Sequence, residues 1–136
     1  MRQQENSSAR TDLELEHESG ATAQIRLERC VAGRLESAYP ASVRDVEIRV
    51  VALSDGGLLT AVLEGVVRAV RSAEPACRRI IYGAPRGQVG AVAASEQAGF
   101  RYVVDVDLVD AELSLLVSEP EWVSVADEAA DAVPGS

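Results

Sequence analysis

The chain has 136 residues and a formal net charge of −9, and every one of its 13 Lys-or-Arg positions holds arginine. A chain of this length is expected to form one domain, and its charge disfavours nucleic acids and anionic membranes as partners. No apolar run approaches the roughly 20 residues of a membrane-spanning helix, and the first residues lack the apolar centre of a signal peptide. We therefore expect a cytoplasmic protein.

Both ends of the sequence are predicted to be tails. Residues 1–20 are polar and charge-rich without a sustained apolar period, which indicates a flexible polar tail. Residues 125–136 are acidic and rich in alanine, which indicates a second flexible tail. A single domain is thus predicted over residues 21–124.

The first half of this domain reads as strands. Residues 23–31 alternate apolar and charged side chains, and residues 34–39 follow at hairpin spacing, so two antiparallel strands are predicted. Residues 43–53 form a longer run with many β-branched side chains. Its later half is apolar on both faces, which is typical of a central strand covered on both sides.

The second half begins with Ser-Asp-Gly-Gly at residues 54–57, which ends the strand, and an amphipathic helix is predicted over residues 58–72. A short apolar strand at residues 79–84 completes a strand-helix-strand unit, whose two strands are expected to be parallel. A helix over residues 88–98 and strands at 102–108 and 112–118 follow. The predicted fold class is α/β (α+β), a mixed, mostly antiparallel sheet with a central parallel βαβ pair.

The segment 88–100, QVGAVAASEQAGF, is the most distinctive part of the sequence. It resembles the last helix of the GNAT superfamily of acyl-CoA N-acyltransferases, which commonly reads Asn, two residues, Ala, three residues, Tyr, three residues, Gly-Phe. Here these places hold Gln88, Ala91, Ser95, Gly99 and Phe100. The order of the predicted elements also matches the GNAT fold from its second strand onward. The resemblance implies a GNAT-like domain without the family's N-terminal strand and two helices, which normally form one wall of the acceptor pocket.

The resemblance also implies a site for acetyl-CoA or another acyl-CoA between the splayed ends of the two parallel strands. The pantetheine arm would pair with the backbone of the first strand, and the pyrophosphate would bind N–H groups at the start of the following helix. The implied cofactor-binding residues are Val51, Ala52, Leu53, Gly56, Gly57, Leu58 and Gln88. The family's loop carries an Arg or Gln and two spaced glycines, whereas Asp55 here brings a negative charge. The alternative is a simple turn with an N-cap for the helix.

Three side chains are the catalytic candidates that the resemblance implies. Ser95 takes the place of the family's Tyr, which protonates the leaving thiolate, and its hydroxyl could orient a sulfur or a water. Glu47 lies where such enzymes often carry a base, although its alternation with apolar residues is also typical of a solvent-facing carboxylate. Tyr82, like Tyr102, is a substitute donor on a neighbouring strand or a packed aromatic.

The remaining polar clusters do not indicate a metal. Cys30 and Cys77 are far apart and the chain has one His, so neither zinc nor a disulfide is predicted and both thiols are expected to be buried. Asp105, Asp107 and Asp110 are expected on a solvated strand face rather than around a cation.

Two functions from different classes fit these observations. The first is an acyl-CoA-dependent N-acetyltransferase acting on an unknown amine. The second is a catalytically inactive GNAT-like binding or dimerisation module, which the changed positions at residues 55, 88 and 95 favour. Strand edges left uncovered by the missing helices would make a homodimer.

Overall fold

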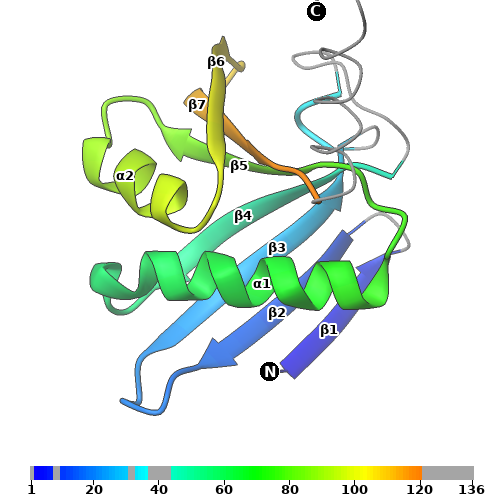
Figure 1. Cartoon of the computed structure of the whole chain (residues 1–136), viewed down its shortest axis with the longest axis vertical. Helices are drawn as coiled ribbons and strands as arrows, with labels where there is room; N and C mark the ends of the chain where they lie inside the picture. The colour runs from blue at the N-terminus through cyan, green and yellow to red at the C-terminus, as the bar shows by residue number, and fades with distance from the viewer. Residues whose placement is uncertain (1, 8–9, 31–32, 37–43, 121–136) are drawn as a thin grey trace, which may run out of the picture.

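The computed structural model describes residues 2–7, 10–30, 33–36 and 44–120. In chain order the elements are β1 (Arg2–Ser7), β2 (Arg10–Glu16), β3 (Thr22–Arg29), β4 (Val46–Leu53), the 3-10 helix η1 (Gly56–Leu58), α1 (Leu59–Ala73), β5 (Ile80–Pro85), α2 (Val89–Gln97), β6 (Arg101–Asp107) and β7 (Glu112–Ser118). The strands form one sheet in the order β1-β2-β3-β4-β5-β7-β6 (Figure 1). Only β4 and β5 are parallel neighbours, which confirms the predicted fold class.

Both helices pack on one face of the sheet. The apolar stripe of α1 lies against the central strands in a core that contains Leu63, Val66, Ile25, Ile48 and Ile80. The stripe repeats every three or four residues, so burial of one side of the helix accounts for its position. Helix α2 joins α1 through a hydrogen bond in which Thr60 Oγ1 donates to the Ala94 carbonyl at 2.9 Å.

The opposite face, which we call the open face, differs between its two halves. Over β5, β7 and β6 it is apolar, and Leu35 from the turn at residues 33–36 packs there against Ile81, Leu115 and Val117. Over β2, β3 and β4 it is polar: Asp12, Arg26 and Arg49 lie in one row across the three strands. Among the described residues, no helix covers this half.

The predicted N-terminal tail is wrong where the structure describes it, because residues 2–7 and 10–16 are strands β1 and β2. Strand β2 has only two apolar side chains, Leu13 and Leu15, and both pack into the helix-side core. The rest of the stability of β2 comes from pairing with β3, which a one-dimensional pattern does not reveal. Strand β1 is an N-terminal edge strand that the sequence did not predict. Only two residues separate β1 from β2, so the family's two helices have no counterpart between them.

The predicted strand at residues 34–39 is also wrong in its described part. Residues 33–36 form a turn in which the Glu36 N–H donates to the Gly33 carbonyl at 3.2 Å. Strand β3 pairs with β2 and β4 instead, so both of its edges are occupied before the turn is reached. Residues 37–39 and the predicted tail at residues 125–136 lie outside the described residues.

Candidate active site

A slot opens between β4 and β5 in the centre of the sheet. The two strands pair at only three positions, from Val46 with Ile80 to Ile48 with Tyr82. Beyond them β4 continues to Leu53 paired with β3 alone, and β5 continues paired with β7 alone. Val51 is an extra residue on β4, because Ile25 pairs with Val50 and Gln24 with Ala52. A bulge of this kind bends its strand, which accounts for the divergence.

A cleft of about 470 Å³ lies at this slot. Its lining residues come from β3, β4, β5, the turn at residues 33–36 and the start of β7: Arg26, Arg34, Arg49, Val50, Val51, Tyr82, Gly83, Pro85, Ala111, Glu112 and Leu113. Three arginines and one carboxylate are the charged groups in this set. Each of these arginines is paired with a carboxylate outside the lining, Asp12, Glu28 or Glu47, so the cleft presents guanidinium groups whose charge is largely balanced, in a chain that is strongly negative.

Arg34 is held in the cleft by a buried carboxylate. Its Nε donates to both oxygens of Glu47 at 3.2 and 3.0 Å, and its Nη2 donates to Glu47 Oε2 at 2.6 Å. The Glu47 side chain is 1% exposed and that of Arg34 is 22% exposed. Burial raises the pKa of Glu47 above its ordinary value of 4.5, and the bond from Arg34 opposes that rise. A Cβ on Gly83 would lie 3.4 Å from Arg34 Nη2, so glycine leaves room for the guanidinium.

Glu47 is therefore not the solvent-facing carboxylate that the sequence allowed. It lies beneath Arg34 and does not line the cleft. The role that this geometry supports is to hold the arginine in place, because a buried carboxylate bonded on both oxygens has little capacity left for a substrate proton. A role for Glu47 as the base stays a prediction.

The other two arginines are directly opposite each other on neighbouring strands. Arg26 pairs in register with Arg49. Arg26 Nε donates to Asp12 at 3.0 Å, and Arg49 Nη1 donates to Glu28 at 3.0 Å. All four side chains keep between 16% and 34% of their surface exposed. Two like charges directly opposite each other destabilise a sheet, so their carboxylate partners offset a cost that this arrangement creates.

Tyr82 and Ser95, the other catalytic candidates, have different surroundings. Tyr82 lies at the last paired position of β5, lines the cleft and contacts Phe100 edge-on with ring centroids 6.4 Å apart. Burial raises the pKa of Tyr82, which keeps its phenol protonated. Ser95 is fully buried, and its hydroxyl donates to the Val92 carbonyl within α2 at 2.8 Å. Of the two, Tyr82 alone reaches the cleft, and a catalytic role for Ser95 stays a prediction.

The loop between β4 and α1 is capped by its own carboxylate. Asp55 is the N-cap of η1, and its Oδ1 accepts a hydrogen bond from the Gly57 N–H at 2.9 Å. This is the arrangement of the alternative interpretation, a turn with an N-cap. A Cβ on Gly56 would meet no atom within 4 Å, so nothing in the described chain requires a glycine there. Gly56 therefore leaves open space beside the backbone at the start of the helix.

The remaining predicted positions are at the end of β4 and before α2, and of them Val51 lines the cleft. Val51 is 54% exposed, Ala52 is exposed and Leu53 is half-buried, all beyond the last β4–β5 pair. Gln88 is the exposed N-cap of α2 and makes no side-chain capping bond. Their contribution to cofactor binding stays a prediction.

The acidic residues of β6 surround an arginine. Arg86 Nη1 lies 2.8 Å from Asp107, and its Nε lies 3.9 Å from Asp105, which also accepts a hydrogen bond from Ser114. Within the described residues no group of three or more His, Cys, Asp or Glu could hold a metal ion. Cys30 and Cys77 are both buried free thiols, and burial raises the pKa of Cys30 to about 12.

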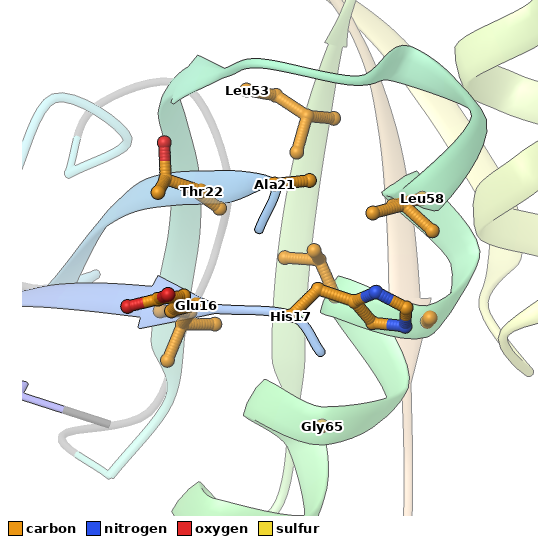
Figure 2. Close-up of a pocket in the computed structure, with 11 residues that line it drawn as sticks. Glu16, His17, Ala21, Thr22, Leu53, Leu58 and Gly65 are labelled. Carbon is orange, nitrogen blue, oxygen red and sulfur yellow. The ribbon is translucent and has the colours of Figure 1, made fainter. Parts of the chain in front are cut away.

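A second cavity, of about 230 Å³, lies on the helix side of the sheet, between the β2–β3 turn and the start of α1 (Figure 2). It is lined by Leu15, Glu16, His17, Ala21, Thr22, Ala23, Leu53, Leu58, Ala61, Val62 and Gly65. His17 Nδ1 accepts a hydrogen bond from the Ser19 N–H at 3.1 Å. The polar groups at this rim bond among themselves, and the cavity is separate from the arginines of the cleft.

No protein-family model and no curated protein matches the sequence. Solved acetyltransferases match the fold. The aminoglycoside acetyltransferase AAC(6')-Ib in complex with coenzyme A and kanamycin is similar with a TM-score of 0.71 and 16% identity, over 88% of this chain and 72% of that one. A variant of the spermidine N-acetyltransferase SpeG from Vibrio cholerae is similar with a TM-score of 0.61 and 10% identity, over 84% and 68%.

An uncharacterized protein (bh2621) from Bacillus halodurans gives a TM-score of 0.74 at 18% identity, and this chain spans 61% of that one. Because the identities are low, these likenesses establish the fold alone. The chain has the GNAT fold of acyl-CoA N-acyltransferases, as the segment 88–100 predicted. Within the described residues, no helix is long and apolar enough to cross a membrane.

Sequence reasoning missed four charged side chains of the cleft, Arg26, Arg34, Arg49 and Glu112. One signal could have found Arg49, which interrupts an apolar run on β4 at a position that faces away from the helices. Arg26 gives no such signal, because it belongs to the regular alternation of apolar and polar side chains on β3. Arg34 could not be found in this way, because the strand predicted around it is a turn.

Proposed function

We propose that this protein is an acyl-CoA-dependent N-acetyltransferase that acts on an amine held in the cleft between β4 and β5. The observation that carries the proposal is the divergence of these strands after Ile48 and Tyr82. Within the part of the chain that the structure describes, the five residues of β4 from Arg49 to Leu53 have no partner on their β5 side, so their backbone groups are available to an extended ligand. A sheet with a continuous β4–β5 ladder would offer no such groups.

The residues around the slot fit acyl-CoA in part. We assign the pantetheine arm to the backbone of Val51, Ala52 and Leu53 and the pyrophosphate to the η1 start at Gly56, Gly57 and Leu58, with Gln88 on the other side. The carboxylate of Asp55 already accepts the Gly57 N–H that a phosphate would use. Binding of the pyrophosphate therefore requires Asp55 to turn away, and we expect weak affinity for the cofactor.

Acyl-CoA supplies an acyl group activated as a thioester. The amine attacks the carbonyl carbon, so one C–N bond forms, the C–S bond breaks, and the proton that the amine loses balances the proton that the thiolate gains. Tyr82 is our candidate to donate to the leaving sulfur, because it lies at the last β4–β5 pair and burial of its ring in the helix-side core keeps the phenol protonated. Glu112, the carboxylate among the lining residues, is exposed at the rim and is our candidate to receive the amine proton.

The second candidate is a GNAT-like module that binds or dimerises without catalysis. Two observations favour it: the helix start is capped by Asp55, and the Ser95 hydroxyl bonds within α2. A homodimer also belongs to our proposal, since β1 and β6 are the edges of the sheet and expose unpaired backbone groups. Light scattering on a sizing column checks the mass, and a monomer at all concentrations contradicts the dimer. A cytoplasmic location stays a prediction.

Calorimetric titration with acetyl-CoA separates the two functions. We expect saturable binding that Gly56→Leu abolishes, because the new side chain fills the open space beside the helix start without meeting another atom of the protein. Ser72→Leu, at the exposed far end of α1, is the matched control and should bind like the native chain. Absence of binding at millimolar acetyl-CoA, with the fold intact by circular dichroism, would reject the acetyltransferase and leave the module.

A further inference from the structure

We propose that the cleft selects an acceptor that carries a carboxylate near its amine, and that Arg26 and Arg49 bind this carboxylate. The inference rests on the proposed function, because it names the substrate class of the same site. The carboxylate site is argued from the composition of the cleft and not from the position of the cofactor. It can therefore be tested separately from cofactor binding.

The lining of the cleft is rich in arginine although the chain is acidic. Three of the 13 arginines line one cleft in a protein of net charge −9, and Glu112 is the single carboxylate among the lining residues. Asp12, Glu28 and Glu47, which pair with the arginines, do not line it. An anion that enters the cleft therefore meets guanidinium groups first.

A polyamine would need the reverse arrangement. The similar proteins named above include one bound to kanamycin and one whose name specifies spermidine, both polycationic amines. A site for such ligands is expected to carry several carboxylates, since complementary charge gives specificity and like charge repels. Among the lining residues of this cleft the one carboxylate that could receive a second ammonium group is Glu112, which already pairs with Arg86.

Stability does not account for Arg26 and Arg49. The Arg34–Glu47 pair is buried and holds the turn at residues 33–36, but Arg26 and Arg49 are a third exposed, and ion pairs at such positions contribute only about 0–1 kcal/mol. Their placement directly opposite each other carries a cost for the sheet that the carboxylates of Asp12 and Glu28 offset. Despite this cost, the sheet places two arginines side by side, and their two guanidinium groups lie on one surface.

The guanidinium groups retain donors for a ligand. A guanidinium has five N–H donors in a planar fork, and the bonds seen in the described chain use Nε of Arg26 and Nη1 of Arg49. The remaining donors match the two oxygens of a carboxylate. The cleft volume of about 470 Å³ is within the range of small-molecule sites. It therefore suits an acceptor of amino-acid size.

The test uses two amines of similar length, 4-aminobutyrate and 1,4-diaminobutane, together with glutamate, titrated by calorimetry into the native protein without acyl-CoA. We expect both carboxylate-bearing amines to bind and the diamine not to bind. Arg26→Gln and Arg49→Gln should each weaken binding of 4-aminobutyrate by about tenfold or more, as expected for a charged hydrogen bond. Arg101→Gln removes an arginine that is also bonded to a carboxylate, Glu119, but lies on β6, and should have no effect.

Each outcome decides the proposal. Tighter binding of the diamine, unchanged binding in both cleft variants, or no saturable binding of either carboxylate-bearing amine at millimolar concentration overturns it. Binding of these amines by a protein that does not bind acetyl-CoA supports the carboxylate site and rejects the acetyltransferase. Binding of acetyl-CoA with transfer of the acetyl group only to diamines supports the acetyltransferase and rejects the carboxylate site. Thermal unfolding of all variants shows whether a loss of binding reflects a loss of folding.

Discussion

The two halves of β4 differ in their strand pairing and in their burial. From Val46 to Ile48 the strand is paired on both edges and buried. From Arg49 to Leu53 it is paired on one edge, bulged at Val51 and partly exposed. The first half contributes to the core, and the second half contributes backbone and guanidinium donors to the slot.

This difference shows how one strand can carry stability and binding together. Burial of the first half fixes the position of the strand, so the second half can leave its backbone groups unpaired without being displaced. Glu47 and Arg49 illustrate the division, since one is buried beneath an arginine and the other is an arginine in the cleft. Substitutions in the two halves can test this division between stability and binding.

The largest effect is expected for Arg34→Gln. It leaves the Glu47 carboxylate buried without its charged partner, and loss of one member of a buried ion pair costs about 3–5 kcal/mol of the free energy of unfolding. Chemical denaturation at neutral pH measures this. A loss below about 1 kcal/mol, the value for a surface ion pair, would contradict the structural role of the pair.

The Arg34→Gln penalty should also depend on pH. The pKa of Glu47 is raised in the folded state, so at pH values below its ordinary 4.5 the carboxyl is protonated in both states and the penalty is small. As the pH rises above 4.5 the unfolded state loses its proton first, and stability falls until the folded carboxyl ionises. Denaturation midpoints from acid to neutral pH measure the trend. In the double variant Arg34→Gln with Glu47→Gln, the trend should disappear.

The next largest effect is expected when substitutions in the two halves of β4 are compared directly. Ile48→Ala removes a fully buried side chain from the core and should cost about 2–5 kcal/mol of unfolding free energy. Val51→Ala, on the same strand but more than half exposed, should cost less than about 0.5 kcal/mol. Equal losses for the two variants would show that the second half is also part of the core.

The smallest effect is expected for Asp55→Asn. Asparagine keeps the N-cap but removes the negative charge beside the proposed pyrophosphate position, so acetyl-CoA affinity should rise by about 1 kcal/mol, or roughly fivefold. Calorimetry measures the change, and Glu64→Gln on the exposed face of α1 is the control for net charge. Unchanged affinity would place the phosphates elsewhere.

Much of the fold could be predicted from the sequence, because β3, β4, α1, β5, β6 and β7 each carry an apolar run or period, and α2 was predicted from its resemblance to the last helix of the family. Strands β1 and β2 could not, since the apolar side chains of β2 are only Leu13 and Leu15 and its remaining stability comes from pairing with β3. The cofactor-binding positions on β4 came from the family resemblance and stay a prediction, and one of them, Val51, lines the cleft. The charged side chains of the cleft were not predicted, because they come from segments that meet only in the fold.

The sequence by itself determined the order of the central elements and, through the segment 88–100, the fold. These features depend on local periods of hydrophobicity and on small residues where a helix packs closely on a sheet. The resemblance already implied that the two parallel strands diverge, but only the tertiary structure decided where they do so, that Glu47 lies buried beneath Arg34, and that Arg26 and Arg49 face one cleft. Strand register and the bulge at Val51 fix those positions, and both arise from pairing between strands distant in sequence.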